Sequence, residues 1–352
     1  MNLVGEVKDR SLRDMLATPG LVNRHFCTCK PDKQHSARLS RLQRRRRLQS
    51  FDDFAREQAS DLKMRSNDPI IMLRPVAEDV TEVGEKEIEM EEAMGLHVEH
   101  VKAFLSAFFL GATVQVLPVA RASFPQGKSP KENLRLFMRT LHKEAPAEAR
   151  CCLAITTVPL CQEKDGCIHG VSGLKFGSGV ATFAGLRRSD TGTVTRPEQV
   201  WRLLLLLSRE ICHLLGLSHC EAFECRMNAA ADFASSAATD LCPICLHKLQ
   251  HSLGFDVKKR FAALDSALAA IHEVLAKENA DGHANNEVEL NYMSLITQDQ
   301  NWLRRILASF DPDSQHMQAG SPKVAAVAAA LPPGRPPGLK LSPRRGGGVM
   351  VE

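Results

Sequence analysis

The chain has 352 residues, of which 44% are hydrophobic and 24% charged, values typical of a soluble globular protein with one or two domains. Aromatic residues make up only 5% and the formal net charge is only +4, which argues against a nucleic-acid surface built from stacked rings. No apolar stretch is long enough to cross a membrane, and the leucine run Leu203–Leu207 contains five residues.

Both ends of the chain are predicted to lie outside the folded domain. Residues 1–50 are basic, with Arg41 and Arg44–Arg47 close together, and we expect a disordered arm. Residues 313–352 are rich in Pro, Gly and Ala, which predicts a disordered tail. The N-terminal residues carry charges and no apolar core, so we expect a cytoplasmic location. A nuclear-import signal in the arginine cluster is the alternative.

Between the two ends, helical and strand patterns alternate over residues 51–312, which predicts one domain of the α/β or α+β class. Gly216 follows the longest helical pattern and suits a left-handed helix cap. The expected elements are a helix over 98–109, a strand over 112–119, a helix over 134–141, strands over 152–158 and 179–183, and helices over 201–215, 258–277 and 301–310.

The end of the 201–215 helix carries a pattern typical of a zinc site. In a His-Glu-x-x-His sequence, the two histidines lie one turn apart on one helix face and can bind the same zinc ion, while the Glu activates the zinc-bound water. A Gly three residues further on lets the chain turn so that a third histidine completes the site. Here Glu210, His213, Gly216 and His219 are in register, and Arg209 stands where the first histidine is expected.

Four cysteines follow this pattern directly. Cys220-x₄-Cys225 and Cys242-x₂-Cys245 supply four thiolates within 26 residues, which suits a closed tetrahedral zinc site with a structural role. The alternative interpretation is four unrelated buried thiols. The remaining cysteines upstream of the helix do not have the spacing of a compact zinc site, and we expect free thiols at Cys151, Cys152, Cys161 and Cys167.

These residues resemble the archaemetzincins, whose signature is the extended histidine motif followed by Cys-x₄-Cys-x-Met and then Cys-x-x-Cys. The chain reads His219-Cys220-x₄-Cys225-Arg-Met227, then 14 residues, then Cys242-Pro-Ile-Cys245, a slightly short spacer. The resemblance extends over about residues 100–275. It implies a metzincin-like mixed sheet, an active-site helix and a C-terminal subdomain stabilised by a cysteine-bound zinc ion.

The resemblance also implies a role for each matching residue. Glu210 corresponds to the general base, and His213 and His219 to two of the three ligands of a catalytic zinc ion. Met227 stands at the methionine turn. The ligands of the structural zinc ion correspond to Cys220, Cys225, Cys242 and Cys245. The strand expected to pair with a peptide substrate at the sheet edge comprises Gly179, Val180, Ala181, Thr182 and Phe183.

Arg209 departs from the family pattern. A guanidinium stays protonated and offers no lone pair to a metal, and at about 4 Å it repels each unit of positive charge by roughly 4 kcal/mol at an effective dielectric constant of about 20. Cys212 is a nearby soft ligand, but it lies about 100° around the helix from His213. Two functions therefore compete: a zinc peptidase that acts on peptides, and a non-catalytic relative that binds peptides or partners without cutting.

A zinc-ribbon-like nucleic-acid binder that uses the Arg44–Arg47 cluster is a third, weaker hypothesis, because the aromatic content and the net charge are low. No sequence feature specifies an oligomeric state.

Overall fold

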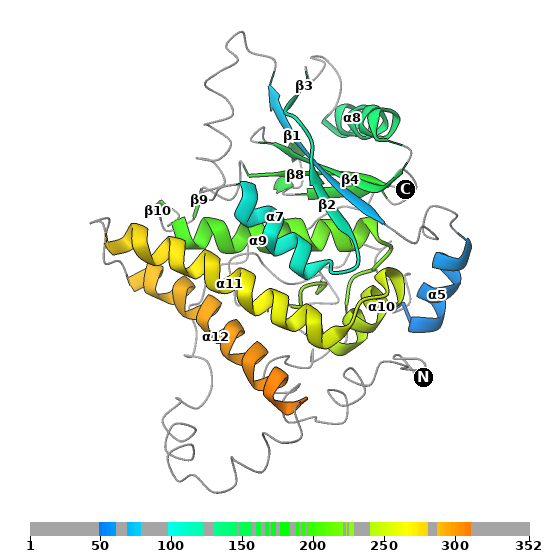
Figure 1. Ribbon diagram of the computed structural model, residues 1–352. Helices are drawn as coiled ribbons and strands as arrows, with labels where there is room; N and C mark the ends of the chain where they lie inside the picture. Colours follow the sequence, from blue (N-terminus) through cyan, green and yellow to red (C-terminus); the bar gives the residue numbers. More distant parts are fainter. Residues whose placement is uncertain are drawn as a thin grey trace, which may run out of the picture.

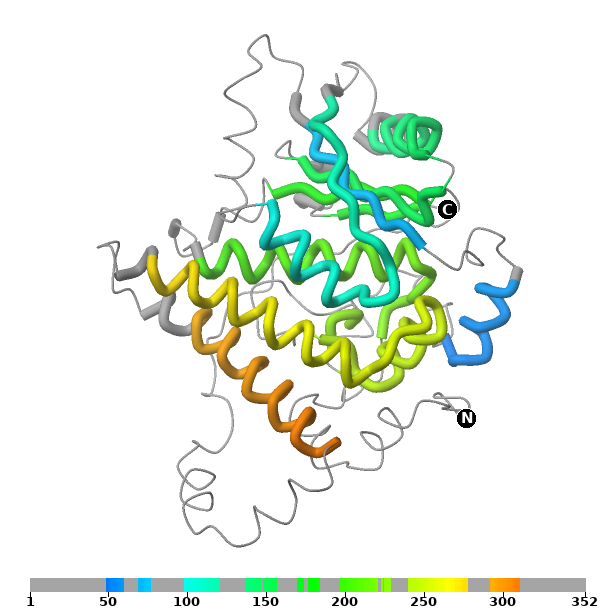
Figure 2. The backbone as a smooth tube through the Cα atoms, in the orientation of Figure 1, coloured from blue at the N-terminus to red at the C-terminus, as the bar shows by residue number. Residues whose placement is uncertain are grey.

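In the computed structural model, a mixed sheet lies between helices (Figures 1 and 2). The structure describes residues 49–60, 69–78, 98–122, 130–146, 148–156, 160–162, 166–168, 170–173, 177–183, 188–189, 192–193, 196–220, 223, 225–228, 240–280 and 287–310. The arm and tail expected over 1–50 and 313–352 lie outside these residues, except for Gln49 and Ser50, which are buried.

The main sheet has the strand order β2-β1-β4-β8-β7, with β3 also paired to β1. Strands β1, β2, β3, β4 and β8 run parallel, and β7 pairs antiparallel with β8. The expected α/β class with a mixed sheet is therefore confirmed. The strands of this sheet are β1 (Ile70–Glu78), β2 (Thr113–Val116), β3 (Ala120–Ala122), β4 (Ala149–Thr156), β7 (Gly170–Gly173) and β8 (Ser178–Thr182). Two hairpins complete the described strands, β5 (Leu160–Gln162) with β6 (Gly166–Ile168), and β9 (Arg188–Ser189) with β10 (Gly192–Thr193).

Strand β1 lies inside the sheet although it contains a proline. Its first half pairs with β2 and its second half with β3, and Pro75 lies where the partner changes. A proline has no N–H to donate to a ladder, so it is tolerated at such an interruption. The strand expected over 112–119 is correspondingly split into β2 and β3, with Pro118 between them.

Helices cover both faces of the sheet (Figure 1). Helix α8 (Pro130–Glu144) packs Leu134, Met138 and Leu141 on one face in a small core. On the other face, α7 (Val98–Phe108) and α9 (Arg196–Leu214) enclose the main core. Because successive strand residues point to opposite faces, Leu153 enters the main core and Ala154 the small one.

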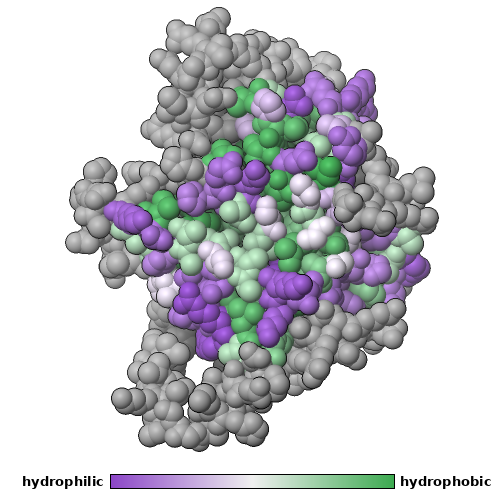
Figure 3. All heavy atoms as spheres, viewed as in Figure 1, coloured by the Kyte–Doolittle hydropathy of each residue, from purple (hydrophilic) through white to green (hydrophobic). Residues whose placement is uncertain are grey.

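The remaining helices lie further from the sheet, on the α9 side. They are α5 (Phe51–Ser60), α10 (Pro243–Leu253), α11 (Val257–Ala280) and α12 (Glu287–Ser309). Helices α11 and α12 form a pair that packs on α7 and α9, and the face of the molecule seen in Figure 3 mixes hydrophilic and weakly hydrophobic side chains over this region. No helix in the described part of the chain is both long and apolar enough to cross a membrane.

The prediction that residues 179–183 form the edge strand is wrong. Strand β8 contains four of these residues and has a partner on each side, β4 and β7, while Phe183 lies just beyond it. Among the described strands, β7 lies last in the order, and all four of its residues are buried. Strand order depends on how the chain packs, and the local pattern of residues 179–183 does not encode it.

Candidate metal centre

The site is built on the C-terminal end of α9 and the turn that follows it. The turn contains Gly216 in a left-handed conformation, with φ of +89°. The amide of Gly216 donates to the carbonyl of His213 at 3.0 Å, and that of Leu217 donates to Cys212 at 3.0 Å. These bonds satisfy the last carbonyls of the helix, and the predicted glycine cap is confirmed. The turn redirects the chain so that it brings His219 back towards the helix.

His213 and His219 lie side by side after this turn. Their ring centroids are 4.6 Å apart and the rings are nearly perpendicular, at 83°. His213 is buried, with its Nδ1 atom 2.8 Å from the carbonyl oxygen of Leu217. A carbonyl can only accept, so Nδ1 carries the proton, and Nε2 is the unprotonated nitrogen of the neutral ring. The structure thus brings together the two imidazoles that the sequence predicted to be neighbours.

Arg209 occupies α9 one turn before His213, on the same face of the helix. Its side chain is only 6% exposed. Burial lowers the pKa of Arg209, while the nearby Glu210 carboxylate and the Cys225 sulfur raise it. A buried cation with no lone pair thus stands where a third neutral ligand is needed, and two imidazoles with an arginine do not fit a catalytic zinc ion.

Glu210 is held against strand β7. The hydroxyl of Ser172 donates to its carboxylate at 2.5 Å, and a Cβ atom placed on Gly170 would lie 2.7 Å from the same carboxyl carbon. Burial raises the pKa of Glu210, and the hydrogen bond from Ser172 and the charge of Arg209 oppose that rise. The glycine is therefore needed for a close approach between the edge of the sheet and this side chain.

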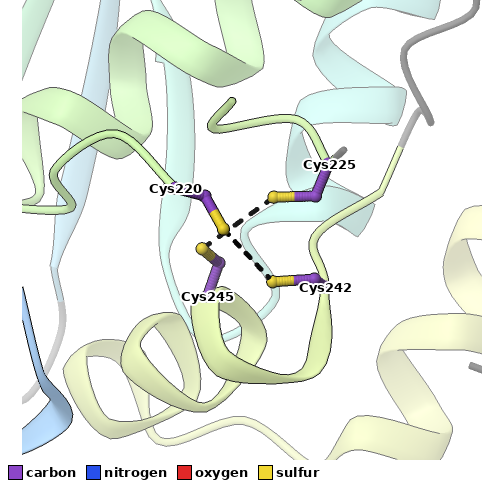
Figure 4. Close-up of side chains that lie close together, drawn as sticks. All are labelled: Cys220, Cys225, Cys242 and Cys245. Carbon is purple, nitrogen blue, oxygen red and sulfur yellow. Dashed lines mark hydrogen bonds between the residues drawn. The ribbon is translucent and has the colours of Figure 1, made fainter. Parts of the chain in front are cut away.

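The four cysteines converge beside this turn (Figure 4). The sulfurs of Cys220 and Cys242 are 3.8 Å apart, those of Cys225 and Cys245 are 4.0 Å apart, and all four lie within 4.8 Å of one another. All four residues are buried. Hydrogen bonds from the other three thiols lower the pKa of Cys220. Four soft, buried donors around one point fit a tetrahedral zinc ion.

The backbone around the cluster is fixed by short bonds. The amide of Cys220 donates to the carbonyl of Met227 at 2.7 Å, and that of Asn228 donates to Cys225 at 2.9 Å. Met227 is fully buried in the main core. Its role as a methionine turn stays a prediction.

A buried ion pair supports the other half of the cluster. Arg260 of α11 donates to both carboxylate oxygens of Asp240, at 3.1 and 2.7 Å, and its Nε donates to the Phe108 carbonyl at 2.8 Å. Its guanidinium lies 4.7 Å from the centre of the Phe108 ring. Asp240 precedes Cys242 by two residues, so this ion pair ties the cysteine segment to α7 and α11.

Two further cysteines in the described part of the chain, Cys151 and Cys152, do not join the cluster. Cys151 and Cys152 are free and buried in β4, as expected. Burial, together with the neighbouring Cys152, raises the pKa of Cys151 to about 12. Burial also raises the pKa of Cys152, to about 11. Cys161 and Cys167 face each other in the register of the β5–β6 hairpin, and their side chains lie outside the described ones.

Three polar residues near the site were not predicted from the sequence: Ser172, Gln49 and Gln58. They lie 38 to 169 residues from the α9 and turn groups that they contact. No local pattern marks such residues, because the contacts arise only from packing.

Comparison with known proteins finds two kinds of relatives. A sequence model of Peptidase family M54 matches residues 126–251. Archaemetzincin-2 from Rattus norvegicus is 28% identical over 206 residues, which cover 48% of this chain and 57% of that protein. Archaemetzincin-1 from Homo sapiens is 32% identical over 214 residues, covering 49% of this chain and 43% of that protein. The chain thus spans about half the length of the curated relatives it matches.

Among solved structures, an archaemetzincin from Methanopyrus kandleri is similar with 21% sequence identity and a TM-score of 0.37. That likeness covers 54% of this chain and 98% of the other one.

Proposed function

Because this chain belongs to the archaemetzincin family, Peptidase family M54, we propose that it is a non-catalytic zinc protein of the peptidase class. In this proposal the cysteine cluster holds one structural zinc ion, and the histidine site holds no catalytic one. The ligand is a peptide or a protein segment, a class that rests on the family membership. The chain binds it without cleaving it.

Arg209 is the observation that carries this proposal. A catalytic zinc site needs three protein ligands and an open position for water. Of the three ligand positions in the family pattern, His213 and His219 offer lone pairs and Arg209 does not. The guanidinium one turn before His213 is 6% exposed, so water screens its charge poorly. It removes one ligand and adds repulsion towards a dication, and both effects lower zinc affinity at this site.

The cysteine cluster supports the other half of the proposal. Its four sulfurs lie within 4.8 Å of one another and are buried. An ion at their centre would have four protein ligands, and water would have no open coordination position. Such a site contributes to folding, because ligand geometry of this kind does not exist in an unfolded chain.

An active peptidase with Glu210 as general base remains the alternative. Two observations favour it: the carboxylate of Glu210 is fixed by Ser172 at 2.5 Å, and the ring of His213 is fixed by Leu217 at 2.8 Å. Glu210 and His213 are thus held in fixed positions, as a catalytic site requires, and Arg209 is the residue that departs from such a site.

Metal analysis of purified protein tests the proposal. We expect about one zinc ion per chain in the natural sequence and about two in Arg209→His, because the substitution restores the third ligand. Arg304→His is the matched control: it places a new histidine on the exposed face of α12, and we expect about one zinc ion per chain.

Peptide hydrolysis separates the two functions. We expect none from the natural sequence, and hydrolysis from Arg209→His that is lost when Glu210→Ala is added. Two tightly bound zinc ions in the natural sequence would contradict the non-catalytic function, as would hydrolysis that Glu210→Ala abolishes. An Arg209→His protein with only one zinc ion would show that Arg209 is not the cause.

A further inference from the structure

The turn between His213 and His219 is held by a residue far away in the sequence. The amide nitrogen Nε2 of Gln49 donates to the carbonyl of Gly216 at 3.1 Å, across 167 residues of chain. The carbonyl Oε1 of the same side chain accepts from the backbone amide of Ser218 at 3.1 Å. Gln49 is only 8% exposed, so both bonds are largely protected from water.

Gln58, which lies in α5, holds the start of the same turn. Its Nε2 atom donates to the carbonyl of Leu215 at 2.8 Å, and that atom lies 2.9 Å from where a Cβ on Gly216 would be. Its Oε1 atom accepts from Arg150 of β4 at 3.1 Å and from Ser252 of α10 at 3.3 Å. The side chain is therefore fixed at both ends and cannot turn away without breaking several hydrogen bonds.

The segment that carries both glutamines is itself anchored on α10. The buried ammonium of Lys248 donates to the backbone carbonyl of Gln49 at 2.5 Å and to its Oε1 at 3.2 Å. The ring of Phe51 stacks on His247 with centroids 4.0 Å apart and an angle of 3° between the rings. Helix α10 also carries Cys245. The segment therefore links the helix of this candidate metal ligand to the turn that leads to His219 and Cys220.

From these contacts we infer that residues 49–60, here called the N-terminal clasp, act as a positioning element for both halves of the site. Gln49 and Gln58 set the path of the turn, and so fix His219 and the adjacent Cys220 relative to His213. The clasp lies outside residues 126–251, the range that matches the family model. The inference rests on the proposed function only for the zinc ion at the cysteine cluster.

Amide hydrogen exchange by NMR on the full chain tests the clasp without reference to zinc. In Gln49→Leu we expect the Ser218 amide to exchange about tenfold faster, because the substitution removes the Gln49 oxygen that accepts its hydrogen bond. The Leu217 amide donates to Cys212 within the helix cap and should change far less. Gln298→Leu makes the same substitution on the exposed face of α12 and should alter neither amide.

Zinc release to a competing chelator provides the second measurement. We expect faster release in Gln49→Leu than in Gln298→Leu, because Cys220 follows the loosened turn directly. Gln49→Glu keeps the acceptor for Ser218 and Lys248, but it replaces the amide that donates to Gly216 and, at 2.7 Å, to the Glu57 carboxylate with a second carboxylate. We therefore expect it to release zinc faster than the natural protein, because the turn loses its donor and the two carboxylates repel each other. This variant also serves if Gln49→Leu does not fold.

The outcomes separate a positioning role from a general contribution to stability. Unchanged Ser218 exchange in Gln49→Leu would overturn the clasp, as would zinc release from Gln49→Glu that is no faster than from the natural protein. Equal acceleration of all core amides, which reports global unfolding alone, would overturn it too. A natural protein without zinc would contradict the proposed function, while the exchange of Ser218 would still decide the clasp.

Discussion

At the scale of single residues, Arg209 and Cys220 lie on the same helix and turn yet favour opposite outcomes for a metal ion. The guanidinium offers five donors and no acceptor, and it stays charged when buried. A thiol can lose its proton to become an anionic ligand. Eleven residues apart, the chain thus changes from a cationic side chain, which repels a metal dication, to a thiol, which suits a zinc ligand.

Cys242 and His219 allow the two centres to be compared by stability. We expect Cys242→Ser to lower the free energy of unfolding by several kcal/mol, because it removes one of four zinc ligands in the core. His219→Ala should cost about 1 kcal/mol or less, since its side chain is half-buried and the proposed function places no zinc there. Urea unfolding in zinc-containing buffer measures both, and equal, mild effects would mean that the cysteines bind no metal.

At the scale of the elements, two helices end at glycines with positive φ, which offer a matched pair. Gly216 has φ of +89° and Gly254, after α10, has φ of +71°. A Cβ on Gly254 would meet nothing within 4 Å, whereas one on Gly216 would lie 2.9 Å from the Gln58 amide. An alanine at either position would strain the backbone, because φ is positive at both. Only the alanine at position 216 would also collide with a side chain.

For Gly254→Ala we therefore expect a loss of about 1–2 kcal/mol in the free energy of unfolding, from the backbone alone. For Gly216→Ala we expect a clearly larger loss, because the Gln58 side chain must move and give up hydrogen bonds that hold the turn. Urea denaturation of the two variants measures the difference. A Gly216→Ala protein as stable as Gly254→Ala would argue that the clasp adapts freely.

Helix and strand prediction succeeded where the signal was local. Apolar spacing located α7, α9 and α11, and Gly216 marked the end of α9, because these signals lie within a few neighbouring residues. Strand β1 and helix α5 were not predicted, since Pro75 interrupts the β pattern and α5 is short and polar. Helix α12 begins at Glu287, well before the expected residue 301, and Tyr292 in its N-terminal half contacts Glu198 of α9, a long-range contact that the local pattern does not indicate.

At the scale of the whole molecule, α12 docks on α9 through buried polar groups as well as apolar ones. The hydroxyl of Tyr292 donates to the carboxylate of Glu198 at 3.0 Å, and Arg202 pairs with the same carboxylate. Burial, together with the charge of Glu198, raises the pKa of Tyr292 from 10.0 to about 12. This contact therefore depends on the protonated phenol.

The sign of the pH dependence follows from that shift. The folded-state pKa lies above the unfolded one, so the contribution of Tyr292 to stability is complete below pH 10 and is lost as pH rises towards about 12. Tyr292 is the chain's single tyrosine, so near-ultraviolet tyrosinate absorbance reports it directly. Tyr292→Phe should lose less stability between these pH values than the natural protein, and an unshifted titration near 10 would contradict the buried contact.

The candidate site divides in the same way into local and long-range parts. The spacing of Glu210, His213, Gly216 and His219 lies within one helix and one turn, so the sequence alone determined that the two imidazoles meet. The two cysteine pairs are also local motifs, and their convergence was predicted from four soft ligands within 26 residues.

Only the tertiary structure decided which side chains hold these groups in place. Ser172 reaches Glu210 from β7, the last strand in the described sheet order, and Gln49 reaches Ser218 across 169 residues. Helical spacing is fixed by the geometry of a few consecutive residues, whereas strand order and distant hydrogen bonds depend on how the whole chain packs. The sequence thus determined the ligands, and the fold decided their supports.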